Sequence, residues 1–335
     1  MESGTESGME FGMELTVANA GAWLNRRGIP VTGAAITELG GGVSNRVILV
    51  AGPERRMVLK QSLGKLRVEK EWLSDRDRVF REAAAMRWLD GRVRGGRTPR
   101  VLFEDRNGFT IGMEGAPADV QMWKSRLFRG ELDPAHARAA GTLLGSMIAA
   151  SWANTDAERL FGDQKVFDQL RIDPYYRFTA RQRPEAAEYI GRLVARSASR
   201  RISLVHGDWS PKNLLCGREG MWAIDWEVIH FGDPSYDVGF LLNHLRLKAF
   251  AMPERRAELA GLANEFLAAV QVQLPVDGQW VATSGFEHLP ALMLARVDGK
   301  SPAEYLTEEM RAAARALALA LMERPANTVE EVFGR

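Results

Sequence analysis

One short stretch of the chain places acidic and amide side chains at spacings that suit phosphoryl transfer. Residues 206–215 read HGDWSPKNLL and residues 223–227 read AIDWE, so Asp208 is followed by Asn213 and then by Asp225. Transfer of a phosphoryl group needs a carboxylate that orients and deprotonates the attacking hydroxyl. It also needs oxygen ligands from two positions that hold Mg²⁺ against the phosphates. The pattern therefore predicts Asp208 as the catalytic base, and Asn213 and Asp225 as ligands of Mg²⁺.

Several neighbours of this stretch are candidates for supporting roles. Lys212 is predicted to neutralise charge on the phosphate, although a surface lysine beside a turn is the alternative. Glu227 is predicted to contact a second metal ion, directly or through water, or else to be structural. His206 is expected to bond backbone near the metal aspartate and not to act as a base. Asp233 and Asp237 suit either a brace for the loop or a helix start.

Residues 39–50, LGGGVSNRVILV, place a glycine turn between two apolar runs that favour β-strands. Such a turn lets backbone N–H groups approach phosphate oxygens without side-chain obstruction. A plain hairpin is the alternative, since the run is not G-x-G-x-x-G. The predicted nucleotide contacts in this turn are Gly40, Gly41, Gly42, Ser44 and Asn45.

The next apolar run, MVLK, ends in Lys60, and a helical segment follows that contains Glu82. In kinases a strand lysine contacts the α- and β-phosphates and pairs with a glutamate on a helix. Lys60 and Glu82 are predicted to form that pair. A surface lysine remains the alternative for Lys60, and Glu69 and Glu71 are alternative partners.

Together, the HGD-x4-N and IDWE motifs resemble the catalytic and metal loops of the aminoglycoside phosphotransferase and choline kinase-like family. The resemblance covers about residues 35–250. It implies an α+β, bilobal protein-kinase-like fold with a small antiparallel β-rich N-lobe and a larger, mainly helical C-lobe. It also implies ATP or GTP with Mg²⁺, and transfer to a hydroxyl of a small molecule. By position, the interlobe hinge would be residues 109–117, where backbone groups near Glu114 and Ala116 would meet the nucleobase.

The pattern of apolar residues fits this organisation. Strands are predicted within residues 33–61 and on both sides of a turn at residues 105–108, and a helix is predicted over 79–91. From about residue 117 onward the pattern is mostly helical, except for short strands within 202–226. We predict a disordered leader at 1–14, a nucleotide-binding N-lobe at 15–116, and a C-lobe at 117–335 with the catalytic loop and the acceptor site.

Composition narrows the class of protein. The formal net charge of +1 argues against nucleic-acid binding, which normally needs a concentrated basic excess. Cys216 is the one cysteine and excludes an internal disulfide, which fits a cytoplasmic location. No apolar run reaches the ~20 residues of a membrane span. Neither a membrane nor a nucleic acid is expected as a partner, and the sequence does not decide between a monomer and a homodimer.

The acceptor site has no motif of its own. Residues 167–183 are aromatic and charged without clean helical periodicity, which is typical of a mobile lid or binding loop. Tyr175 and Tyr176 in this segment, and Arg296 beside a turn between two helices, are the predicted acceptor contacts. Their alternatives are core packing and a simple helix connection. Acidic residues outnumber basic ones in 227–335, which favours a neutral or cationic acceptor. The acceptors that the family resemblance implies are aminoglycosides, amino alcohols, methylthioribose and other sugar-like metabolites.

Two other functions compete with this hypothesis. A protein kinase is disfavoured because Gly207 replaces the arginine that a phosphorylated activation loop engages, and because the interval from Asp225 to Asp237 is too short for a peptide-docking segment. A nucleotide-binding pseudokinase with a regulatory role is disfavoured because each predicted catalytic position holds a competent residue. Tight nucleotide binding without turnover would favour the pseudokinase.

Overall fold

The computed structural model describes residues 13–40, 45–53, 55–64, 75–218 and 220–335. The chain divides into two compact units. The first unit comprises residues 1–87 and 99–117, and the second comprises 88–98 and 118–335. Among the described residues, none of the helices combines the length and the apolar character needed to cross a bilayer.

The first unit is built on an antiparallel sheet of five strands in the order β1-β2-β3-β6-β5. The strands are β1 (Ala35–Glu38), β2 (Asn45–Ala51), β3 (Arg56–Ser62), β5 (Val101–Asp105) and β6 (Thr110–Glu114). β2 and β3 pair from Asn45↔Ser62 to Ala51↔Arg56. The unit also contains α1 (Val17–Arg26) and most of α2 (Arg78–Leu89). The strands and helices predicted for this region are therefore present.

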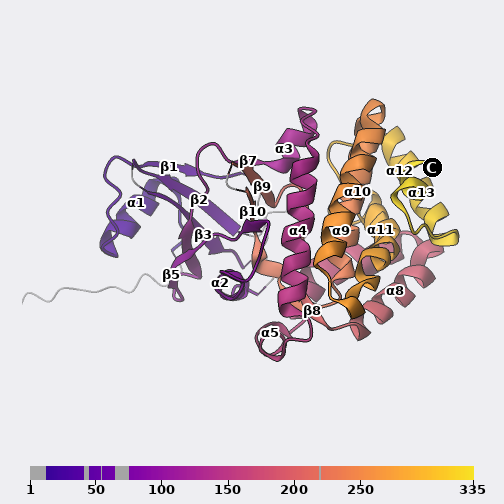
Figure 1. Ribbon diagram of the computed structural model, residues 1–335. Coiled ribbons are helices and arrows are strands. Elements are labelled where there is room, and N and C mark those ends of the chain that lie inside the picture. The colour runs from indigo at the N-terminus through magenta and orange to yellow at the C-terminus, as the bar shows by residue number, and fades with distance from the viewer. Residues whose placement is uncertain (1–12, 41–44, 54, 65–74, 219) are drawn as a thin grey trace, which may run out of the picture. The chain divides into compact units, whose positions relative to one another are not determined.

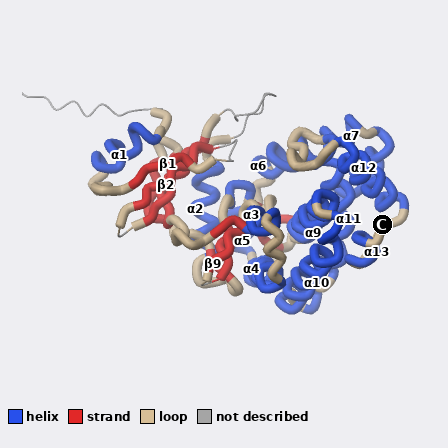
Figure 2. Tube along the Cα trace, turned by 90° about the horizontal axis from the view of Figure 1, so that it is seen from above, coloured by secondary structure: helices blue, strands red, loops and turns tan. Residues whose placement is uncertain are grey.

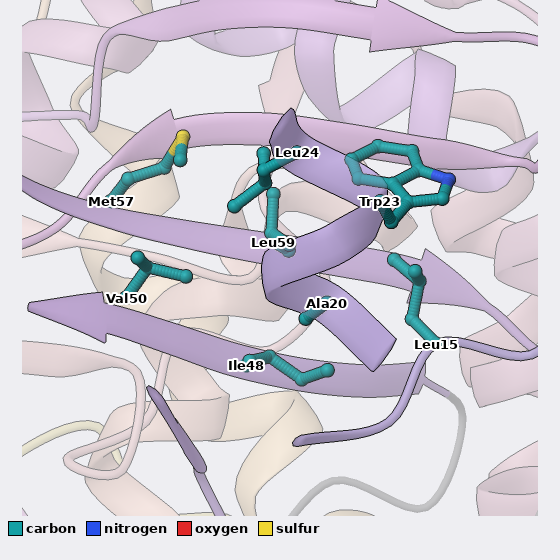
Figure 3. Packing of buried hydrophobic residues seen from close by; sticks show 8 residues of the cluster. All are labelled: Leu15, Ala20, Trp23, Leu24, Ile48, Val50, Met57 and Leu59. Atoms are coloured by element: carbon teal, nitrogen blue, oxygen red, sulfur yellow. The ribbon is translucent and has the colours of Figure 1, made fainter. Parts of the chain in front are cut away.

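Helix α1 supplies much of the apolar core of this unit (Figure 3). Its start is fixed by a capping box, in which the Thr16 side chain and the Asn19 side chain each accept a backbone N–H of the other residue. Figure 3 shows the helix lying against the strands of the sheet, so that its buried side chains meet those of β2 and β3. Eight buried side chains make up this apolar core: Leu15, Ala20, Trp23, Leu24, Ile48, Val50, Met57 and Leu59. Burial of this apolar surface holds the strand that carries Lys60.

The second unit is mainly helical (Figures 1 and 2). Its helices are α3 (Trp123–Phe128), α4 (Pro134–Ser151), α5 (Thr155–Phe161), α6 (Lys165–Phe167), α7 (Phe178–Gln182), α8 (Ala187–Ser199), α9 (Ser235–Ala251), α10 (Arg256–Gln273), α11 (Trp280–Asp298), α12 (Glu308–Glu323) and α13 (Val329–Phe333). Both α4 and α9 pack beside α10, and α9 also packs beside α11. α4 begins at an Asp-Pro sequence, where the Asp133 side chain accepts the Ala135 N–H.

The α9–α11 crossing is tight because it brings two glycines together. A Cβ on Gly239 would lie 2.5 Å from the Gly285 carbonyl oxygen, and a Cβ on Gly285 would lie 2.5 Å from a Val238 methyl group. Both distances are far below normal contact, so glycine is required at both positions. The crossing fixes the N-terminal half of α9, which carries Asp237.

Short strands in this unit carry the predicted chemistry. β4 (Gly96–Arg97), β10 (Gly220–Ala223), β9 (Leu214–Gly217) and β7 (Gln121–Met122) form one sheet in that order. β8 (Ser203–Val205) pairs with β11 (His230–Gly232). The short strands predicted within 202–226 are thus β8, β9 and β10, and β9 and β10 form a hairpin. The parallel pairing of β10 with β4 was not predicted, because the two strands are far apart in sequence.

Residues 167–182 are helical, so the prediction of a binding loop over 167–183 was wrong. A ten-residue π-helix, Asp168–Arg177, connects α6 to α7 and contains Pro174. A π-helix has i→i+5 hydrogen bonds, so its apolar residues do not repeat at the α-helical period. The missing periodicity that suggested a loop therefore reflects the wider turn of this helix.

Candidate active site

Asp208 lies buried in the loop between β8 and β9, with its carboxylate between two cations. Arg171 Nη2 and Lys212 Nζ each lie 3.0 Å from the same oxygen, Oδ2. Within the described part of the chain, no ion pair or hydrogen bond reaches the other oxygen, Oδ1. Oδ1 is therefore the atom of this carboxylate that can accept a hydrogen bond from a hydroxyl group.

Arg171 is the functional residue that the sequence analysis missed. It projects from the π-helix, it is buried, and its Nε donates to the Gly207 carbonyl while Nη1 donates to the Leu170 carbonyl at 2.7 Å. One guanidinium thus holds both the backbone and the side chain of the catalytic loop. Because arginine stays charged in proteins, it holds Asp208 across the whole working pH range.

The backbone of the loop is held by Asp237, at the start of α9. Asp237 Oδ2 accepts the His206 N–H at 2.6 Å, and Oδ1 accepts the Gly207 N–H at 2.9 Å. This confirms the predicted bracing role of Asp237. Burial raises the pKa of Asp237 to about 7, although the two N–H groups oppose that rise. Gly207 itself has φ +79°, and a Cβ there would lie 2.7 Å from a Val228 methyl group. The loop therefore requires glycine at this position.

His206 has the supporting role predicted for it. Its Nδ1 accepts the Asp208 N–H at 3.1 Å, so Nε2 carries the proton and donates to the Ile224 carbonyl at 3.0 Å. Burial lowers the pKa of His206 to about 4, so the ring is neutral. Ile224 immediately precedes Asp225, so the neutral imidazole links the loop of Asp208 to the predicted metal aspartate.

Of the two roles predicted for Asp233, a brace for the loop or a helix start, the structure shows the helix start. Its Oδ1 accepts both the N–H and the hydroxyl of Ser235, at the first residue of α9, which is the helix-start alternative. Within the described residues, no hydrogen bond or ion pair joins Asp233 to the catalytic loop. The brace of that loop is therefore Asp237 and not Asp233.

Asn213 and Asp225 come together through the β9–β10 hairpin. The Ile224 N–H donates to the Asn213 carbonyl at 3.0 Å, so Ile224 lies opposite Asn213 and Asp225 is the next residue along the chain. Asn213 Nδ2 donates to the Asp208 carbonyl at 3.0 Å, so the amide oxygen is the atom of this side chain that would bind the predicted metal ion. Asp225 is held in the left-handed region, at φ 68° and ψ 57°. This conformation costs a non-glycine residue energy and is typical of functional sites.

These oxygen donors fit Mg²⁺, which takes one or two protein ligands and completes its shell with water and phosphate oxygens. Glu227 lies two residues beyond Asp225 and is buried. Among the residues that the structure describes, no group of three or more His, Cys, Asp and Glu side chains could hold a metal ion alone. The set therefore suits an ion that arrives with a nucleotide.

The positive charges of two neighbouring side chains keep the Asp208 carboxyl group ionised. Burial by itself would raise the pKa of this carboxyl group, but the nearby charges of Lys212 and Arg171 outweigh burial and hold the pKa below its usual value. The carboxylate is therefore in the acceptor state at neutral pH, as the predicted role requires.

The first unit contains the predicted phosphate lysine. Lys60 Nζ lies 2.6 Å from Glu82 Oε2, and both side chains are buried, so the predicted ion pair is present. The alternative partners Glu69 and Glu71 lie outside the described residues. Asn45 is buried at the start of β2, and Gly40 follows β1 by two residues. Gly41, Gly42 and Ser44 lie outside the described residues.

The predicted hinge atoms already have partners within the first unit. The Glu114 N–H donates to the Arg100 carbonyl at 2.8 Å, and the Ala116 carbonyl accepts Arg56 Nε at 2.8 Å. A contact of this segment with the nucleobase stays a prediction.

The predicted acceptor residues lie in different surroundings. Tyr176 is fully buried, and its hydroxyl lies 2.7 Å from His288 Nδ1. Tyr175 lies beside Arg171, whose guanidinium carbon is 5.6 Å from the centre of the tyrosine ring. Arg296 is in α11, and its Nη1 donates to the Ser301 hydroxyl at 2.7 Å. Their contact with an acceptor stays a prediction.

Comparison with known proteins places this arrangement in context. The profile of a family described as "Phosphotransferase enzyme family" matches residues 35–269. Methylthioribose kinase 2 of Oryza sativa subsp. japonica is 26% identical over 245 residues, which cover 64% of this chain and 57% of that protein. The chain spans less than two thirds of the length of the curated relatives that it matches.

Solved structures share the fold. An amicoumacin kinase in complex with AMP-PNP, Ca²⁺ and Ami aligns with a TM-score of 0.57 and 13% identity, over 88% of this chain and 89% of that one. A choline/ethanolamine kinase family protein from Mesorhizobium loti aligns with a TM-score of 0.52 and 17% identity, over 90% of this chain and 93% of that one. These likenesses bear out the α+β, protein-kinase-like fold that the motifs implied.

Proposed function

We propose that this chain, which belongs to the phosphotransferase enzyme family, transfers the γ-phosphate of ATP or GTP to a hydroxyl group of a small molecule. The observation that carries the proposal is the state of Asp208. Its Oδ2 is held by Arg171 and Lys212, while Oδ1 can receive the acceptor hydroxyl.

The reaction follows from this geometry. The acceptor hydroxyl donates to Asp208 Oδ1, which aims its oxygen at the γ-phosphorus. As the new O–P bond forms, the bond from the γ-phosphorus to the bridging oxygen breaks and releases the nucleoside diphosphate. The hydroxyl proton passes to Asp208. A carboxylate of low pKa is a weak base, so its main contribution is to orient the hydroxyl, which suits the loose transition state of phosphoryl transfer.

The other residues of the site would stabilise the negative charge of the phosphate groups. Asn213 and Asp225 would hold Mg²⁺, which when bound neutralises charge on the phosphates. Lys212 lies beside the carboxylate and can stabilise negative charge on the transferred group. Lys60, oriented by Glu82, would contact the α- and β-phosphates. The names of the rice relatives and of the structural neighbours support ATP as the nucleotide and a small molecule as the acceptor.

A coupled assay that detects released ADP or GDP tests this function. The panel should contain aminoglycosides, amino alcohols, methylthioribose and sugars, each with and without Mg²⁺. We expect acceptor-dependent, Mg²⁺-dependent turnover and a phosphorylated product of matching mass. Tight binding of nucleotide with no turnover across this panel would favour the pseudokinase instead.

A further inference from the structure

A second group of charged side chains lies beside the catalytic loop in the second unit. Lys124 lies in α3, Lys212 in the catalytic loop, Lys248 in α9 and Arg296 in α11. We call these four residues the cation cluster. Their charges all act on His244, which lies one helical turn before Lys248 in α9. The proposed transfer reaction uses only Lys212 of this set.

Lys248 is the centre of the cation cluster. Its side chain is buried, with 1% of its surface exposed. Its Nζ lies 5.4 Å from the centre of the Phe128 ring and 5.5 Å from that of Tyr305, and the two rings are 5.0 Å apart. A cation within about 6 Å of an aromatic ring centre is attracted by the ring, so both rings stabilise this ammonium group. Within the described residues, the one hydrogen bond of this ammonium group is a long contact of 3.4 Å to the His244 carbonyl.

The N-terminus of α3 connects this centre to the catalytic loop. The Lys124 N–H donates to the Pro211 carbonyl at 2.8 Å, immediately before Lys212. Lys124 and Phe128 are four residues apart in α3, so they share one face of that helix. The face that begins at the catalytic loop therefore continues to the ring that covers Lys248.

Three members of the cation cluster lack a carboxylate partner. In the described portion of the chain, Lys124, Lys248 and Arg296 form no ion pair with an Asp or Glu side chain. Among the same residues, nothing forms a hydrogen bond with the buried Arg296 Nε or the buried Tyr305 hydroxyl. A fully buried lysine is rare unless it is paired, because removing an unpaired charge from water is costly. Such a costly arrangement is typical of a binding site.

The electrostatics agree with the geometry. Burial is the main cause that lowers the pKa of Lys248 to about 7, and the charges of Lys124 and Arg296 lower it further. Burial and then the four cations likewise hold the pKa of His244 well below its usual value. Each positive charge therefore disfavours the others, and a bound anion would relieve that repulsion.

We propose that the cation cluster binds an oxyanion, either a carboxylate or a phosphate, that is part of the acceptor molecule. This proposal rests on the proposed phosphotransferase function. His244 and Lys248 follow Asp237 by seven and eleven residues in α9, which corresponds to roughly 10 and 16 Å along the helix axis. Lys248 therefore lies well away along α9 from the residue that braces the catalytic loop, whereas Lys212 lies 3.0 Å from Asp208 Oδ2. An acceptor whose anionic group binds at the Lys248 end of the cluster is therefore an extended molecule, with its reacting hydroxyl at the opposite end.

The excess of acidic residues in 227–335 pointed instead to a neutral or cationic acceptor. That excess counts charges spread over all of residues 227–335. Water and salt screen exposed charges from one another beyond about 8 to 10 Å. The local cluster is buried in part and is screened less. The cation cluster, and not the acidic excess of residues 227–335, therefore decides the charge of the ligand.

Inorganic phosphate is a direct probe of the site. The full chain is first saturated with Mg²⁺ and ADP so that the nucleotide phosphate site is filled. Thermal unfolding is then followed with phosphate at a concentration on the order of 20 mM, far above that of the protein. A chloride sample of equal ionic strength is the reference. We expect phosphate to raise the Tm by a few degrees, as binding to the folded state requires. The Lys248→Met and Lys124→Met variants should lose most of this rise.

Lys165→Met is the matched control, because Lys165 is exposed in α6 and lies outside the cation cluster. It should keep the full response. If Lys248→Met does not fold, Lys124→Met carries the test alone, since Lys124 is only half-buried. No rise in wild type would show that phosphate does not bind, and an equal rise in all variants would show an adventitious ion only; either result would overturn the proposal.

A kinetic comparison separates this proposal from the function on which it rests. Lactobionate and lactitol share one skeleton and differ in charge, as do trehalose 6-phosphate and trehalose. If the enzyme phosphorylates hydroxyl compounds, we expect kcat/KM to be at least about tenfold higher for the charged member of a pair, the scale of one hydrogen bond to a charged group. Turnover without that preference would reject the anion site and keep the kinase. No turnover with a retained phosphate response would reject the kinase and keep the anion site.

Discussion

Substituting Arg171 by methionine tests the least expected feature of the active site. The change removes the ion pair to Asp208 Oδ2 at 3.0 Å and the hydrogen bond to the Gly207 carbonyl, while keeping an apolar side chain of similar length. A hydrogen bond to a charged group contributes about 1.5 to 3 kcal/mol and a neutral one about 1 kcal/mol. We therefore expect a loss of roughly 2.5 to 4 kcal/mol in the free energy of unfolding, which a domain of ordinary stability survives.

Catalysis should respond in a way that a purely structural arginine would not produce. The charge of Arg171 helps to hold the pKa of Asp208 low, so its removal raises that pKa. The acid limb of the kcat/KM profile should then move to higher pH, and kcat should fall by about tenfold or more because the carboxylate is held by Lys212 alone. Affinity for the nucleotide should change little.

Arg177→Met is the control, because Arg177 lies in the same π-helix and pairs with Asp168 at the surface. It should keep the wild-type kcat and pH profile. Chemical denaturation and initial rates between pH 5 and 9 provide both measurements. An Arg171→Met enzyme with unchanged kcat and an unshifted acid limb would refute the positioning role of Arg171.

Three further predictions follow from the same structure. Asp225→Ala should abolish Mg²⁺-dependent nucleotide binding, and Lys60→Ala should weaken it with the fold intact; unchanged affinities by titration calorimetry would contradict the assigned phosphate site. Asp237→Asn should cost about 1 to 3 kcal/mol of stability by chemical denaturation, because an amide can accept only one of the two loop N–H groups; no loss would contradict the bracing role. Lys248→Met should stabilise the protein most near pH 6, where the buried ammonium is charged. Because the folded pKa of about 7 lies below the unfolded one, this gain should shrink as pH rises from 7 towards 10. The decrease should be at most about 1.4 kcal/mol per pH unit. A gain that is independent of pH would contradict the assigned pKa.

The catalytic motifs were predictable because their residues are close in sequence. Asp208 and Asn213 share one loop, and a hairpin of adjacent strands brings Asp225 to them, so short-range pattern was enough. The Lys60–Glu82 pair was also predictable, since a strand and the helix that follows it commonly pack together.

The missed residues depend on long-range packing. Arg171 is far from Asp208 in sequence, and its π-helix hides the periodicity from which a helix would be inferred. The cation cluster draws one residue from each of four segments, and Lys248 alone looks like an ordinary helix lysine. Only the folded chain shows that this lysine is buried with no carboxylate partner among the described residues.

The role of Asp208 is the central claim, and the substitution Asp208→Asn tests it most directly. The amide keeps the shape of the side chain but cannot accept the proton. Once an acceptor is identified, turnover should fall by about 10² or more, the usual scale for loss of a general base, with nucleotide affinity by calorimetry almost unchanged. An Asp208→Asn enzyme that keeps more than about a third of wild-type turnover would contradict the account.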